Sequence, residues 1–177
     1  MNLEYKHLLE NSFHPESRVW VYQSSRLFAL SEALEIELLL KDFAAQWQSH
    51  GVPVKGAGYL FFGQFIVLMA DETATGVSGC STDSSVRLIK NIEQRFSVSM
   101  FDRLNLAFVI KDKSDSYRVQ LLPMTQLQYA YDNGFINSDT LYFNNLVQTK
   151  EELEENWLVP IRQSWLAKRI SQTQALS

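Results

Sequence analysis

The residues of this chain that could do chemistry gather around its single cysteine. Gly79, Cys80, Ser81 and Asp83 come at the start of a predicted helix, and Arg87 lies one turn into it. Backbone N–H groups at the start of a helix carry partial positive charge, which holds anions and lowers the pKa of a nearby thiol. The stretch therefore predicts either a nucleophilic thiolate at Cys80 or a turn that binds an anionic ligand.

His50 is the candidate base for such a thiol. It ends the first predicted helix, and in a ferredoxin-like fold that end and the start of the second helix lie at the same end of the sheet. Asp71 and Glu72 lead into the same loop, and their negative charge would raise the thiol pKa unless they bind a cation. Two other interpretations stay open: a buried, inert Cys80, and a His50 that is only a cation at a helix C-terminus.

The common motifs of catalysis and metal binding are absent from the sequence. Cys80 and Arg87 are spaced C-x6-R, one residue longer than the loop of the cysteine-dependent phosphatases, so that phosphate cradle is not predicted. The chain contains no G-x-x-x-x-G-K-[ST], G-x-S-x-G, H-E-x-x-H or C-x-x-C. With one cysteine and three histidines, we expect no metal site and no cofactor.

Composition limits the class of protein further. The 177 residues are 46% hydrophobic and include 11 Phe, 7 Tyr and 4 Trp, enough to fill a core and too many for a disordered chain. Because 16 basic and 20 acidic residues give a net charge of −4, neither nucleic acid nor an anionic membrane is an expected partner. The lone cysteine, the charged opening segment and the absence of a membrane-spanning apolar run predict a cytoplasmic location.

Hydrophobic periodicity predicts an α+β fold. The expected order is strand, helix, strand, strand, helix, strand, at residues 18–23, 32–50, 59–62, 65–70, 84–96 and 104–110. This is the order of a ferredoxin-like two-layer sandwich, with profilin-like layouts as an alternative. The run at 65–70 does not alternate, which predicts a central strand buried on both faces. Ser31 is the expected N-cap of the first helix, and Gly51 its left-handed C-terminal residue.

The rest of the chain is expected to extend the same domain. The sequence predicts one domain over residues 1–177, with a core at 18–122 and a helical extension at 123–177. An extra strand at 117–122 pairs with the last strand of the core, and short helices follow near 126–133 and after the capping-box pattern at 149–152.

Two tryptophans of the extension leave its role open. Trp157 and Trp165 carry large apolar surfaces with a polar tip, a residue type common both in cores and in interfaces. Either they dock the extension onto the domain, or they form an interface with a second copy. A homodimer is therefore one alternative for this chain.

Several segments together resemble a known group of proteins. These segments are RVWVYQ at 18–23, GCSTDSSVR at 79–87, FDR at 101–103, FNNLVQT at 143–149, WLVP at 157–160 and SWL at 164–166. From about Arg18 to Leu166 the chain resembles a family of short uncharacterised bacterial proteins that often carry the label "ABC transporter ATPase". The resemblance implies no mechanism, and the missing nucleotide cradle does not support the label.

These observations predict a cytoplasmic module that binds a small ligand or a protein, without ATPase activity. Its polar recognition residues would be those at the start of the second helix, Gly79, Ser81, Asp83 and Arg87. α+β domains without a complete catalytic set are more often binding units than enzymes, by analogy between folds. The alternative is a thiol-dependent enzyme in which Cys80 is the nucleophile and His50 or a loop group the base.

Overall fold

A computed structural model describes residues 1–49, 51–71, 79–112 and 114–174, without the side chains of 49, 79–82 and 171–174. Its contacts form two compact units. The N-terminal unit contains Leu3–Asp102 and Asn145–Glu154, and the C-terminal unit contains Met1–Asn2, Arg103–Asn144 and the residues from Glu155 onward. The number of independently folding domains stays a prediction.

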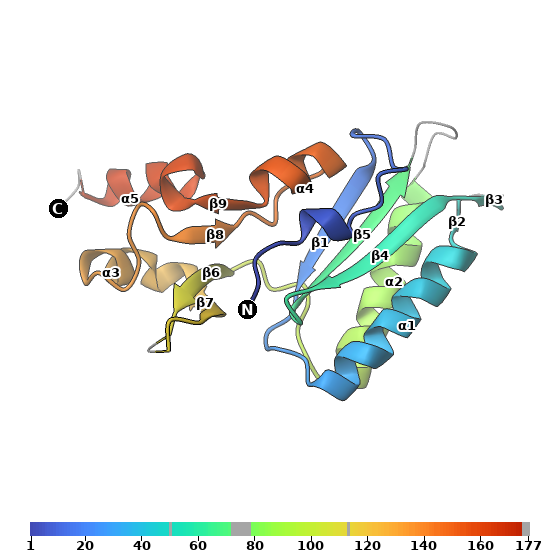
Figure 1. The fold of residues 1–177 in the computed structure, drawn as a ribbon, viewed down its shortest axis with the longest axis horizontal. Coiled ribbons are helices and arrows are strands. Elements are labelled where there is room, and N and C mark those ends of the chain that lie inside the picture. The colour runs from blue at the N-terminus through green and yellow to red at the C-terminus, as the bar shows by residue number, and fades with distance from the viewer. Residues whose placement is uncertain (50, 72–78, 113, 175–177) are drawn as a thin grey trace. The chain divides into compact units, whose positions relative to one another are not determined.

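The N-terminal unit is built on an antiparallel sheet in the order β1-β5-β4. Figure 1 shows α1 and α2 side by side on one face of this sheet, and their side chains share one core with it. A small hairpin, β2 with β3, connects α1 to β4. The elements in chain order are β1 (Arg18–Gln23), α1 (Leu30–Gln46), β2 (Gln48–Ser49), β3 (Val52–Pro53), β4 (Lys55–Phe61), β5 (Phe65–Asp71) and α2 (Gly79–Phe96).

The central strand β5 is buried on both faces, which confirms the prediction for residues 65–70. On the helix side, Ile66 and Leu68 pack with Ile36 of α1 and Ile89 and Ile92 of α2. All five side chains are fully buried. The helical period of α2 therefore determines which of its residues reach the sheet.

The opposite face of the sheet is covered by the N-terminal segment, which shows no sustained hydrophobic period in the sequence. Tyr5, Leu9 and Phe13 are buried there. The Tyr5 ring packs edge-on to Phe61 of β4 at 5.7 Å, and its hydroxyl donates to the carbonyl of Leu153 at 2.6 Å. Burial, with the charge of Glu154 adding to it, raises the pKa of Tyr5 well above its ordinary value, so this tyrosine stays neutral.

The segment 145–154 returns to the N-terminal unit and covers the outer edge of β1. The N–H of Val19 donates to the carbonyl of Gln148 at 2.8 Å, and Arg18 and Thr149 form an antiparallel bridge. In a ferredoxin-like sheet the last strand of the core pairs with β1. In this protein residues 148–149 already occupy that edge of β1. An edge strand has unpaired N–H and C=O groups, which pair with any extended segment that lies within reach.

The α+β class is confirmed, whereas the ferredoxin-like sandwich is not. The strand predicted at 104–110 is β6 (Asn105–Lys111), which pairs with β7 (Tyr117–Pro123) and β8 (Leu141–Phe143) rather than with β1. The predicted hairpin of residues 104–110 and 117–122 is thus confirmed. Its sheet belongs to the C-terminal unit.

The boundaries of α1 differ from the prediction of residues 32–50. The helix ends at Gln46, and Gly51, with φ +79°, forms the turn of the β2–β3 hairpin instead of closing the helix. Ala29, not Ser31, occupies the N-cap position. Trp47, the last apolar residue of the predicted helix, is buried just beyond the helix end.

The C-terminal unit contains an antiparallel sheet in the order β7-β6-β8-β9. The short strands β8 and β9 were missed in the sequence, because three residues are too few to show an alternating pattern. Of the predicted capping box, the N-cap is confirmed, since Thr149 Oγ1 accepts from the N–H of Glu152 at 3.1 Å, whereas the Glu152 side chain accepts from the N–H of Gln148 at 2.7 Å. The further elements of this unit are α3 (Leu127–Asp132), β9 (Leu158–Pro160) and α5 (Leu166–Gln174), whereas α4 (Lys150–Asn156) begins in the segment 145–154 of the N-terminal unit.

The two tryptophans of the extension pack inside the C-terminal unit. Trp157 is fully buried, with its ring 5.4 Å from that of Phe143. Trp165 is partly buried, and its ring lies 6.5 Å from that of Tyr142. Both indoles are therefore packed within the C-terminal unit, and the homodimer stays a prediction.

Candidate functional site

The residues predicted to act at the start of α2 lie within the helix itself. α2 begins at Gly79, five residues before the predicted start at Ser84. Residues 79–83 are small and polar, so they carry no apolar period, although their backbone continues the helix that Ile89 and Ile92 anchor. The predicted cap at Ser81 or Asp83 is therefore wrong.

The structure describes the side chains of only some of these predicted site residues. Asp83 and Arg87 are exposed on α2. The side chains of Cys80 and Ser81, and the whole of His50, lie outside the described residues, so the pairing of thiol and base stays a prediction. The described part places the Asp83 carboxylate and the Arg87 guanidinium one turn apart at exposed positions of α2, and their role in ligand binding stays a prediction.

Asp71 at the end of β5 has a cation beside it. Lys55 Nζ lies 3.4 Å from Asp71 Oδ2 and 4.7 Å from the ring centroid of Phe13. The lysine thus offsets the carboxylate and also packs over an aromatic face. The sequence analysis considered a bound cation at this carboxylate, and Lys55 provides a positive charge from within the chain.

An aromatic cluster fixes the end of α1 on the sheet. The rings of Trp20 and Trp47 are 5.7 Å apart, and the guanidinium of Arg18 lies 5.0 Å over Trp20. One edge of the Trp47 indole presses on Gly56 of β4, where an added Cβ would come within 2.5 Å of Cε3. Only a glycine leaves room for the ring at this position.

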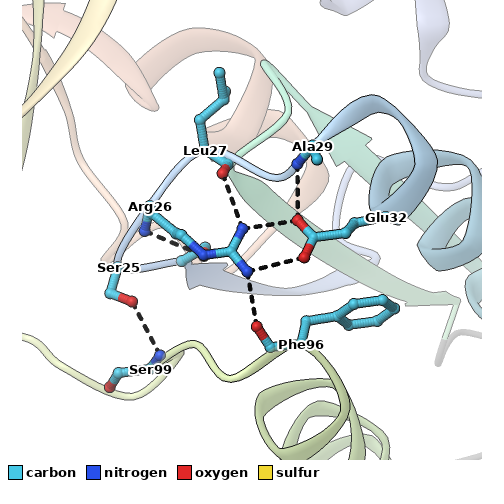
Figure 2. A network of polar contacts seen from close by, with 8 residues as sticks. Ser25, Arg26, Leu27, Ala29, Glu32, Phe96 and Ser99 are labelled. Carbon is cyan, nitrogen blue, oxygen red and sulfur yellow. Dashed lines mark hydrogen bonds and ion pairs between the residues drawn. The ribbon is translucent and has the colours of Figure 1, made fainter.

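A polar network fixes the start of α1 (Figure 2). Arg26 donates to both carboxylate oxygens of Glu32, from Nη1 at 2.7 Å and from Nη2 at 2.9 Å. Nη2 also donates to the carbonyl of Phe96, the last residue of α2, at 2.7 Å. Because the N-cap residue Ala29 has no side-chain acceptor, Glu32 accepts its N–H at 2.7 Å. The pair therefore connects the first turn of α1 to the end of α2.

This network predicts an acid-sensitive contribution to stability. The hydrogen bonds from Arg26, and then that from Ala29, lower the pKa of Glu32 from 4.5 to about 2. A carboxyl whose pKa is lower in the folded state stabilises the protein above its unfolded pKa, and the contribution is lost as the pH falls from 4.5 to about 2. We expect Glu32→Gln to lower the urea midpoint near neutral pH, and this deficit to vanish near pH 2.

Glu37→Gln is the matched control, because Glu37 is an exposed carboxylate of the same helix outside the network. The change in urea midpoint caused by Glu37→Gln should not show the pH dependence between 4.5 and 2 that is expected for Glu32→Gln. A Glu32→Gln deficit that is equally large at both ends of this range would contradict the role given to the Arg26–Glu32 pair.

The outer face of α1 carries three exposed leucines. Leu30, Leu34 and Leu38 are 78%, 56% and 64% exposed. Their spacing of four residues places them on one side of the helix, in a row about 12 Å long. We call these three residues the leucine row. Exposed polar side chains surround it, at Ser31, Glu37, Lys41 and Asp42.

The sequence analysis missed the leucine row because it assigned the helix a single apolar face. That face is confirmed, since Ile36 and Leu40 are buried and Leu39 and Phe43 are partly buried against the core. The signal was nevertheless present. Leucines at i, i+4 and i+8 that lie outside the core-facing stripe indicate a helix with two apolar sides.

A second exposed apolar feature belongs to the C-terminal unit. Tyr129 and Phe135 are 65% and 66% exposed, and their rings stack with centroids 6.3 Å apart. This is one pair at the end of the short helix α3. The leucine row is longer and lies on a helix that is fixed at both ends, so it is the stronger candidate for a functional surface.

Metal and membrane sites receive no support from the described residues. No group of three or more His, Cys, Asp or Glu among them is arranged to hold a metal ion. None of the described helices combines the length and the apolar character needed to cross a lipid bilayer. In comparisons with known proteins, no family model, no curated protein and no solved structure matches this chain.

Proposed function

We propose that this protein is a protein-binding or assembly module, and that the leucine row of α1 is its contact surface. The observation that carries the proposal is the alignment of Leu30, Leu34 and Leu38 on one helix face, each more than half exposed. Single exposed leucines are ordinary, whereas aligned ones form a contiguous apolar patch, and the largest such patch on a folded protein is often functional.

The row is held rigidly, which favours binding. The opposite side of α1 is anchored by Ile36 and Leu40 in the core, the start by the Arg26–Glu32 pair, and the end by Trp47. A surface that is already ordered loses little conformational entropy when a partner docks. The fold therefore presents the leucines in a fixed geometry.

The shape of the surface favours a protein over a small ligand. Small molecules bind in concave pockets that surround most of their surface. The leucine row lies on the convex outer side of a helix, with polar residues around it, which is the anatomy of a protein interface with an apolar centre and a polar rim. The sequence predicted a module that binds either a small ligand or a protein. The shape of this surface supports the protein-binding module better.

Four further predictions belong to this proposal. A cytoplasmic location is supported by the single cysteine, and the lack of ATPase activity by the missing nucleotide cradle. A relation to ferredoxin-like folds is supported by the order β1-β5-β4, in which residues 148–149 take the place beside β1. The resemblance to the short bacterial family fits the same proposal, because it implies no catalytic mechanism.

The thiol-dependent enzyme is the second proposal, supported by one observation. Cys80 lies in the first turn of the 18-residue helix α2, where backbone N–H groups favour a thiolate. Alkylation of the native protein, followed against pH, separates the two proposals. An inflection well below the ordinary thiol pKa of about 8.5 favours the thiol-dependent enzyme, and an inflection near that value rules this second proposal out.

The proposed contact surface can be tested by photo-crosslinking in the cells that make the protein. With a photoreactive residue in place of Leu34, we expect one covalent adduct of defined mass. Leu38→Lys in the same chain should abolish this adduct, because a charge in the row is costly to bury against an apolar partner. A photoreactive residue in place of Lys90, exposed on α2, is the control. Equal adducts at both positions, or none at position 34, would overturn the proposal.

A further inference from the structure

We propose that the outer edge of β4 binds an extended peptide segment of a partner protein, which adds to the sheet as a further strand. This edge is separate from the leucine row, so the inference goes beyond the proposed function. Strand addition requires an edge strand whose backbone N–H and C=O groups are unpaired and accessible. β4 is such an edge strand, since it is the last in the order β1-β5-β4 (Figure 1).

The register of the sheet shows which backbone groups of β4 point outward. In β1 the N–H of Val19 points away from β5, to the carbonyl of Gln148. Because the direction of the backbone groups alternates along an antiparallel strand, the even-numbered residues of β1 bond even-numbered residues of β5. The odd-numbered residues of β5 therefore bond the odd-numbered residues of β4. The residues of β4 that point their N–H and C=O groups outward are Gly56, Gly58 and Leu60.

These outward groups are unpaired and accessible. Among the described residues, no hydrogen bond involves the outward N–H or C=O of Gly56, Gly58 or Leu60. Both glycines are partly exposed. Since glycine has no side chain, the exposed surface at these two positions is backbone surface. The edge thus offers alternating donors and acceptors along about 13 Å of strand.

The edges of the other described strands are covered or blocked. Residues 148–149 cover the edge of β1. In the C-terminal unit, β7 contains Arg118 and ends at Pro123, and β9 has only three residues and ends at Pro160. Charged side chains, prolines and short length are the usual means by which proteins prevent strand addition.

β4 has none of these protections. It has seven residues, contains no proline, and keeps an unbroken register with β5, so no bulge bends it away. Its only charged residue is Lys55, at its first position, and the ammonium of this lysine lies against Asp71 and the ring of Phe13. The middle of the edge is therefore open to another backbone.

The chemistry of the edge determines the kind of partner. Alternating N–H and C=O groups are matched by the backbone of an extended peptide, as residues 148–149 show at the opposite edge of the same sheet. Side chains of an added strand would alternate between the two faces. On the face of the N-terminal segment, one of them would lie beside Tyr59, which is partly exposed and stacks on Phe61.

Tyr59 gives the peptide a sequence preference. Its backbone bonds β5, so it forms a pair without hydrogen bonds with the added strand, in which the side chains come closest. Aromatic and β-branched residues pair well with an aromatic ring across strands. We therefore expect a segment of about five residues, with an aromatic or β-branched residue beside Tyr59 and no proline at the bonding positions.

Selection from a phage-displayed library of random peptides, with the full chain as bait, tests this inference. Selected peptides are synthesised and titrated. Leu60→Pro removes an outward N–H but no hydrogen bond of the fold, so it should weaken their binding at least about tenfold.

Val119→Pro is the matched control on β7. The hydrogen bond from the N–H of Asp112 to the carbonyl of Ser116 fixes the same alternation there, and it points Val119 outward. The proline therefore replaces an outward N–H on the edge of the other sheet. This variant should bind the peptides like the unchanged chain.

Hydrogen exchange of single amides tests the location without any substitution. In the free chain the amides of Gly56, Gly58 and Leu60 should exchange quickly, whereas those of Ala57 and Tyr59, which bond β5, should exchange slowly. A saturating selected peptide should slow the first three at least about tenfold, because each N–H then has a partner.

Three results would overturn the inference. The library could yield no peptide whose binding depends on Leu60, or the bound peptides could leave the three outward amides exchanging as in the free chain. If these amides instead become slower as the concentration of the chain alone rises, copies of the chain pair with one another and the peptide is not the partner. The leucine row is tested separately by the photo-crosslink at position 34, so the proposed function can stand or fall independently.

Discussion

Replacing Leu153 by alanine is expected to lower the free energy of unfolding by about 2–5 kcal/mol, the usual cost of a leucine-sized cavity in a packed core. Leu153 is fully buried, and its carbonyl accepts the hydroxyl of Tyr5. It belongs to the segment 145–154, which groups with the N-terminal unit although it follows the first strands of the other unit in sequence. Urea unfolding, monitored by circular dichroism, measures the loss.

The matched control is Leu146→Ala, which makes the same change in the same segment at a side chain that is 60% exposed. Its effect should stay within about 0.5 kcal/mol, as for other surface substitutions. Hydrogen exchange adds a local measurement, because the Val19 N–H depends on the carbonyl of Gln148. In Leu153→Ala this amide should exchange faster. Equal losses for the two leucines would contradict the burial of the segment.

Replacing Gly56 by alanine is expected to cost about 1–3 kcal/mol or more, through overpacking rather than a cavity. The new Cβ would come within 2.5 Å of Cε3 of Trp47, a ring that is only 3% exposed and already in contact with Trp20 and Phe43. The ring cannot move away without disturbing these contacts. Thermal and urea unfolding of the purified variant measure the effect.

A double-mutant cycle separates this clash from a general intolerance of β4 to substitution. In a Trp47→Leu background the indole is gone, so Gly56→Ala should then cost less than about 1 kcal/mol. Gly58→Ala, whose Cβ would meet Leu40 Cβ at 3.0 Å, should lie between the two. An undiminished cost of Gly56→Ala in the Trp47→Leu background would show that the strain lies in the strand and not against the ring.

The candidate site was predictable only where it depended on local chemistry. The sequence indicated a helix near the cysteine, and the structure has α2 there, beginning earlier at Gly79. It did not indicate the Arg26–Glu32 pair, whose role depends on the carbonyl of Phe96, 70 residues away from Arg26. Nor did it indicate that Asp71 lies beside Lys55, because these residues meet only across the pairing of β4 with β5.

The amino-acid sequence by itself determined the elements whose signal is local. The unbroken apolar run of β5, the core face of α2 at Ile89 and Ile92, and the hairpin of β6 with β7 all follow from side-chain periodicity. Periodicity says which residues share a face. It does not say what covers that face or pairs with an open edge, because such contacts join residues far apart in the chain.

The tertiary structure decided what covers each apolar face and what pairs with each open strand edge. The edge of β1 is covered by residues 148–149 instead of the strand predicted at 104–110, since a strand pairs with whichever extended segment the rest of the chain brings beside it. The second apolar side of α1 stays exposed because the sheet covers only the side of Ile36 and Leu40. An ordinary amphipathic helix in the sequence thus became, in the fold, the candidate contact surface of the protein.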